Sequence, residues 1–148
     1  MNIPRNFFLF LIAVFALADC SQAIKINIAR QSSELIHCEI TFGSDLTTLR
    51  QENAILLQTG IIDTTDEQAP ISAAIVLIDK KEVVLKLANH SEVENETSRR
   101  YEGQGYKLNL SYKTEMSQNN ETIFKGKFVI KKENLKSEYD IVGTTCNL

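Results

Sequence analysis

The chain has 148 residues and carries 16 basic and 19 acidic side chains, which give a net charge of −3 at pH 7. Nucleic acids and anionic membrane surfaces attract proteins with an excess of Lys and Arg, so neither is an expected partner. The length suits one domain with a single hydrophobic core.

The first 23 residues have the order of features that a secretory signal needs. Arg5 supplies a positive charge, an unbroken apolar stretch covers residues 7–18, and polar residues follow. This stretch is shorter than the roughly 20 apolar residues that cross a bilayer as a helix. We predict a signal peptide over residues 1–23, cleaved after Ala23 rather than after Ala18. The mature protein is then secreted or periplasmic and has no transmembrane segment.

The alternative location is a membrane surface. Residues 17–20 (Leu-Ala-Asp-Cys) resemble a bacterial lipobox, in which Cys20 would become a lipidated amino terminus that anchors the protein. Asp19 departs from this motif, which favours a small uncharged residue beside the cysteine. Lipidation of Cys20 is thus an alternative to its removal with the signal.

Two cysteines remain after the predicted cleavage, and both lie in strand-like apolar sequence. Cys38 is near the start of the mature chain and Cys146 is near its end. Because exported proteins fold in an oxidising compartment, we predict a disulfide that ties the first core strand to the last. Closing a loop of about 100 residues stabilises a fold by up to ~4.7 kcal/mol. Two buried free thiols are the alternative.

Alternating apolar residues predict strands along most of the mature chain. The first signals are the three isoleucines of residues 24–28 and a single apolar face made by Ile36, Cys38, Ile40 and Phe42. Residues 71–78 form a nearly continuous apolar run, which is typical of a strand buried on both faces. Residues 83–87 resume the alternation after a polar turn.

Residues 44–60 interrupt this pattern. Ser44 can cap a helix, and leucines follow near helical spacing. We predict one short helix near Ser44–Asn53 that leads into a strand. A longer helix that ends at Gly60 is the alternative.

The carboxyl-terminal part predicts a hairpin and a last strand. Residues 106–112 and 124–130 each place apolar side chains on one face, with a turn over residues 117–120 between them. The last strand spans Tyr139–Cys146, with Gly143 at a β-bulge. About seven or eight strands in total predict one mainly β domain over residues 24–148, either an antiparallel β-sandwich or a small β-barrel.

The outward positions of the predicted hairpin carry positive charge. If its strands pair, five lysines lie on one face: Lys107, Lys113, Lys125, Lys127 and Lys131. This lysine face predicts a binding surface for an acidic protein or an anionic glycan. A solvated face that protects an edge strand from aggregation is the alternative.

Four Asn-x-Ser/Thr sequons begin at Asn89, Asn95, Asn109 and Asn120. They are candidate N-glycosylation sites if the chain passes through a eukaryotic secretory pathway. Chance occurrence is the alternative.

Signals of catalysis are weak. His37 and His90 are far apart, and no nucleophile, metal-ligand or phosphate-loop motif surrounds them. We therefore assign no catalytic residue, no metal and no cofactor. Residues 92–96 are interpreted as a solvated acidic loop and Arg99–Arg100 as an exposed charge pair.

These features predict an exported, non-enzymatic binding module of the cell envelope or extracellular space. One alternative is a carrier whose cavity for a small hydrophobic ligand is lined by Leu108, Leu110, Phe124 and Phe128. The other is a small secreted hydrolase or a hydrolase inhibitor, with residues 92–105 as the inhibitory loop.

Overall fold

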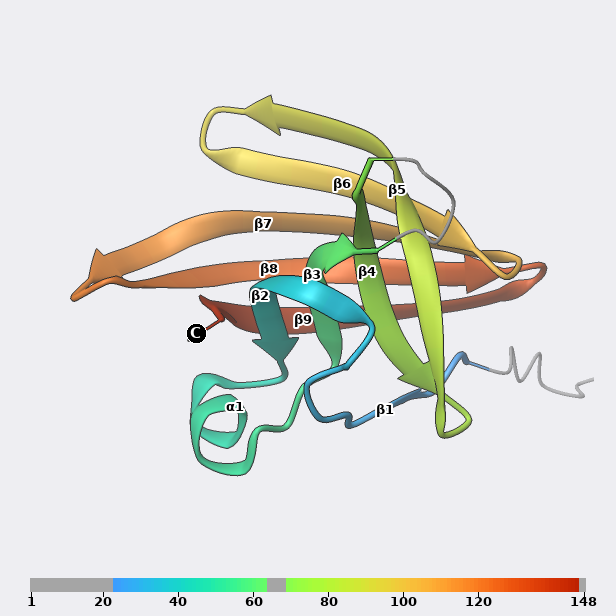
Figure 1. Ribbon diagram of the computed structural model, residues 1–148, viewed down its shortest axis with the longest axis horizontal. Helices are drawn as coiled ribbons and strands as arrows, with labels where there is room; N and C mark the ends of the chain where they lie inside the picture. The colour runs from blue at the N-terminus through green and yellow to red at the C-terminus, as the bar shows by residue number, and fades with distance from the viewer. Residues whose placement is uncertain (1–22, 64–68, 147–148) are drawn as a thin grey trace, which may run out of the picture.

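The computed structural model describes residues 23–63 and 69–146 (Figure 1). The predicted signal peptide up to Gln22, with Cys20, lies outside the described residues. The elements in chain order are β1 (Ile26–Asn27), β2 (Leu35–Gly43), α1 (Leu46–Glu52), β3 (Leu57–Ile62), β4 (Ile71–Ile78), β5 (Lys81–Val93), β6 (Glu96–Gly103), β7 (Tyr106–Gln118), β8 (Glu121–Lys132) and β9 (Leu135–Thr145).

Eight strands close into an antiparallel β-barrel. Each strand from β2 to β8 pairs with the next one in the sequence, and β9 pairs with β2 to complete the ring. The short strand β1 adds to the end of β4, beside the β4–β5 turn (Figure 1). The prediction of a mainly β sandwich or barrel is confirmed, and the pairing of β2 with β9 makes it a barrel.

Two-residue turns join the strands from β4 to β9. Four of these turns have positive φ at both central residues, as type I′ hairpin turns do: Asp79–Lys80, Glu94–Asn95, Gln104–Gly105 and Asn119–Asn120. The interpretation of residues 92–96 as a loop was wrong, because Val93 pairs with Glu96 across the β5–β6 turn. The inhibitory loop suggested for residues 92–105 is likewise wrong, because these residues form strand β6 and the two turns that flank it.

The N-cap of the single helix is Asp45, one residue later than predicted. The Asp45 carboxylate, rather than the Ser44 hydroxyl, accepts the Thr48 backbone N–H at 2.8 Å. Asn53 ends the helix in the left-handed conformation, with φ of 52°. The short helix is confirmed and the extension to Gly60 is wrong, since Gly60 lies within β3.

Side chains fill most of the barrel interior. Phe42, Tyr101 and Phe128 are fully buried there. The predicted bulge at Gly143 is wrong, because β9 pairs with β2 and β8 in unbroken register at that residue. A Cβ on Gly143 would lie 2.5 Å from the Phe42 ring, so the glycine makes room for an aromatic side chain.

The amino-terminal segment closes one end of the barrel interior, the end at which the β4–β5 turn lies. Ile24 and Ile26 pack into the core. The Tyr139 hydroxyl holds them, because it donates to the Ile24 carbonyl at 2.8 Å and accepts the Ile26 N–H at 3.1 Å. We call this half of the interior the closed end.

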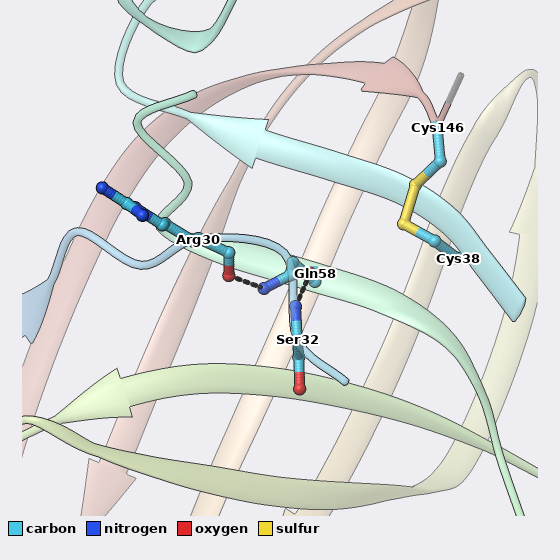
Figure 2. Close-up of a disulfide and its surroundings, with 5 residues drawn as sticks. All are labelled: Arg30, Ser32, Cys38, Gln58 and Cys146. Carbon is cyan, nitrogen blue, oxygen red and sulfur yellow. Dashed lines mark hydrogen bonds between the residues drawn. A yellow bond between two sulfur atoms is a disulfide. The ribbon is translucent and has the colours of Figure 1, made fainter. Parts of the chain in front are cut away.

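The next residues of this segment cover the outside of β3. Figure 2 shows Gln58, which is fully buried, between Arg30 and Ser32. Its amide donates to the Arg30 carbonyl at 3.0 Å and accepts the Ser32 N–H at 2.9 Å. A buried polar side chain on the outer wall is thus satisfied by the backbone that covers it.

The predicted disulfide between Cys38 and Cys146 is confirmed (Figure 2). It joins β2 to the residue after β9, with Cα atoms 5.8 Å apart and a sequence separation of 108. The bridge therefore fastens the seam at which the barrel closes.

Candidate functional site

An open pocket of about 510 Å³ lies at the end of the barrel opposite the closed end. We call it the mouth pocket. Residues from six strands and one turn line it: Glu39, Ile40, Glu92, Asn95, Thr97, Arg99, Tyr112, Thr114, Phe124 and Thr145. The pocket is therefore a feature of the closed barrel and not of any one hairpin.

A β-bulge turns Glu39 toward this pocket. The β2–β3 register shifts between Cys38 and Ile40, which leaves Glu39 as the extra residue on β2. The Glu39 carbonyl accepts the Cys146 N–H at 3.1 Å, so the bulge lies directly beside the disulfide. Bulges redirect side chains at barrel rims, and this one brings a carboxylate to the mouth.

The prediction that Ile36, Cys38, Ile40 and Phe42 share one face of β2 is wrong. A second shift, between Leu35 and His37, places Ile36 outside the regular ladder. Ile36 is consequently 61% exposed, whereas Ile40 and Phe42 are buried in the core. The four residues do not share one face, because each bulge reverses the alternation.

Arg99 on β6 forms a two-pronged ion pair with Glu39. Its two terminal nitrogens each lie 2.9 Å from a different carboxylate oxygen. The Arg99 side chain is only 15% exposed, so its interpretation as half of an exposed charge pair was wrong. Arg100, its sequence neighbour, is exposed as expected. The planar match of guanidinium and carboxylate gives this pair strength and fixed geometry.

Aromatic side chains surround the ion pair. The guanidinium lies 5.9 Å from the Tyr112 ring centre, and it makes a long 3.5 Å contact with the Tyr101 hydroxyl. The Tyr112 ring meets the Phe124 ring edge-on, with centres 5.2 Å apart. The ion pair therefore packs against aromatic side chains that are continuous with the hydrophobic core.

Burial and pairing fix the charge states at this site. The hydrogen bonds from Glu39 raise the pKa of Arg99, so the guanidinium stays charged. Burial raises the pKa of Tyr101 to about 12 and also raises the pKa of Tyr112. Both phenols consequently remain neutral hydrogen-bonding groups at physiological pH.

Both histidines, His37 and His90, are exposed. His90 Nδ1 accepts a hydrogen bond from Arg99 Nε at 3.3 Å. The group at this nitrogen is thus a cation, whereas a hydrolytic pair would place a carboxylate there.

The predicted lysine face exists as a surface of β7 and β8. Lys107 lies opposite Lys131 and Lys113 lies opposite Lys125, while Lys127 lies opposite a serine. Acidic side chains border these lysines, and two ion pairs join them: Lys113 with Glu96 at 3.5 Å and Lys127 with Glu138 at 3.4 Å. Its role in binding stays a prediction.

All four sequon asparagines are exposed: Asn89, Asn95, Asn109 and Asn120. Asn95 and Asn120 each take the second position of a tight turn. Asn109 lies on β7 between Lys107 and Lys113, in register with Arg100 and Val129. A glycan at Asn109 would cover the lysine face, so glycosylation there and docking of a partner on that face exclude each other.

No known protein family, curated protein or solved structure matches this chain. Within residues 23–63 and 69–146, no three His, Cys, Asp or Glu side chains come together as a metal site would need. Over the same ranges, no helix combines the length and apolar character needed to cross a membrane.

Proposed function

We propose that the protein is an exported, non-enzymatic binding protein that takes a small ligand into the mouth pocket. The carrying observation is the Glu39–Arg99 pair, which lies at the pocket and joins residues 60 positions apart in the sequence. The Cys38–Cys146 disulfide is compatible with the extracellular or periplasmic location in this proposal.

The energetic cost of this pair supports a functional role. Partly burying two charges demands desolvation, and well-packed apolar residues of similar size are often as stable or more so. An inward-facing ion pair in a concave site with apolar walls supports ligand binding there. The mouth pocket combines these features with aromatic walls.

The pocket favours a ligand with polar groups over a wholly hydrophobic one. Leu108, Leu110 and Phe128, which the carrier hypothesis placed around a cavity, are fully buried in the packed core. Only Phe124 of that set lines the mouth pocket. Charged and hydroxyl side chains make up most of the remaining lining.

A retention experiment tests this proposal. The folded protein is incubated with the small-molecule fraction of its native extracellular fluid, washed by ultrafiltration and denatured, and mass spectrometry identifies the released compounds. We expect one or more compounds to be retained by the wild type and lost from Thr114→Trp, which fills the pocket. Ser117→Trp, an exposed position on the same strand outside the pocket, is the matched control.

Three outcomes would contradict the proposal. The wild type would retain nothing, or Thr114→Trp would retain as much as Ser117→Trp. In the third, retention would be lost only when Lys125, Lys127 and Lys131 are replaced with Glu, which would assign binding to the lysine face instead.

A further inference from the structure

Most donors of Arg99 are already committed within the protein. Both terminal nitrogens bind Glu39, and Nε binds His90 Nδ1. Arg99 is the one Lys or Arg among the described residues that line the mouth pocket. The Arg99 charge is already paired with Glu39, and Glu92 adds a second carboxylate to the lining, which makes the pocket a poor anion receptor.

Acceptors, in contrast, remain open at the mouth. A carboxylate has about four lone-pair positions, and Arg99 uses only two of those on Glu39. The Glu39 side chain is 41% exposed, so the others can be reached. Glu92 adds a second carboxylate, of which one oxygen accepts the Thr97 hydroxyl at 3.4 Å. The lining thus carries one more negative than positive charge and offers spare acceptors.

The walls next to these carboxylates suit the apolar part of a ligand. Ile40, Tyr112 and Phe124 all line the pocket. The stacking of Arg99 over Tyr112 shows that this ring already interacts with a cation. Carboxylates beside aromatic rings are the combination that recognises organic ammonium groups.

We infer that the mouth pocket binds a small organic cation. Its ammonium group donates hydrogen bonds to Glu39 and Glu92, and its apolar part lies against Tyr112 and Phe124. This inference rests on the proposed function, because it names the ligand class of the same pocket.

Three probes that share a phenyl-alkyl frame test the charge preference: phenethylammonium, phenethyl alcohol and 3-phenylpropanoate. Titrations are followed by NMR at the backbone amides of Thr97, Thr114 and Thr145, which line the pocket. We expect the ammonium to bind about tenfold more tightly than the alcohol, and the carboxylate to bind most weakly.

A pair of charge variants tests the assigned residue. Glu92→Gln should weaken phenethylammonium binding about threefold to tenfold, since it removes one charge from the pocket. Glu94→Gln removes the same charge from the adjacent turn, outside the lining, and should change the affinity less than about twofold. Equal effects of the two variants would overturn the inference.

The probe series separates failure of the ligand class from failure of the pocket. If the alcohol or the carboxylate shifts the three amides and the ammonium does not, the ligand class is wrong and the pocket still binds. If none of the probes shifts them, the cation inference is overturned, and retention by Thr114→Trp decides the proposed function independently.

Discussion

The closed end and the mouth of the barrel are built from the same strands but hold different side chains. At the closed end, inward positions carry Phe128, Ile130 and Leu108, all fully buried. At the mouth, inward positions of the same sheet carry Arg99 and Thr97. Apolar burial therefore concentrates the stability of the fold in one half and leaves the other half free for polar chemistry.

Several register shifts lie in the strands that form the mouth. One lies at Glu39 on β2, a second between Leu87 and Asn89 on β5, and a third between Thr114 and Met116 on β7. Each adds one residue to a strand and changes which side chains point inward. The change from apolar to polar lining is thus produced mainly by the choice of residues, and the bulge on β2 adds Glu39.

The largest expected effect on the free energy of unfolding comes from a matched pair of side-chain truncations, one in each half of the barrel. Phe128→Ala at the closed end should lower the free energy of unfolding by about 3–5 kcal/mol, because the ring is fully buried and stacks on Tyr139. Phe124→Ala at the mouth should cost only about 1–2 kcal/mol, since this ring is partly exposed. Denaturant unfolding measures both. Similar losses would show that the mouth is part of the stabilising core.

The next largest effect is expected when the Cys38–Cys146 disulfide, which lies beside Glu39 of the mouth pocket, is removed. Replacing Cys38 and Cys146 together with Ser should lower the free energy of unfolding by about 2–5 kcal/mol. Because Glu39 lies beside the bridge, the double variant should also loosen the Glu39–Arg99 pair, which the Arg99 Nε resonance reports by NMR. An Arg99 signal identical to that of the wild type would show that the bulge keeps its shape without the disulfide.

Much of the fold was predictable because it follows from local pattern. The apolar run at 71–78, the short helix and the inward face of residues 106–112 depend on neighbours within a few positions, and all are confirmed. The disulfide was predictable because only two cysteines remain after the predicted signal peptide. Barrel and sandwich could not be separated, since the answer depends on the pairing of β2 with β9 at the two ends of the domain.

The candidate site could not be predicted for a related reason. Glu39 and Arg99 are brought together by closure of the ring and by a bulge that leaves no mark in the sequence. Part of a signal was present: Thr97, Arg99 and Tyr101 alternate along one strand, so Arg99 shares the face of Tyr101, which the structure shows to be buried. The doublet Arg99–Arg100 concealed it by resembling an exposed charge pair.

The smallest expected effect appears at alkaline pH, where Tyr101 couples the core to the mouth. Burial raises the pKa of Tyr101 in the folded protein to about 12, above the value of about 10 in an unfolded chain. The neutral phenol therefore contributes stability that is fully present below pH ~10 and is lost as the pH rises toward ~12. Over this interval the free energy of unfolding should fall by up to ~1.4 kcal/mol per pH unit from this group.

The variant Tyr101→Phe isolates that contribution because it keeps the ring and removes the titrating hydroxyl. Its unfolding free energy, measured in denaturant between pH 9 and pH 12, which brackets the two pKa values, should decline less steeply than that of the wild type. The Arg99 guanidinium stays charged through this range, since hydrogen bonding to Glu39 raises the pKa of Arg99. Equal slopes in the two proteins would mean that water reaches Tyr101, and that the polar mouth extends deeper into the barrel than its burial indicates.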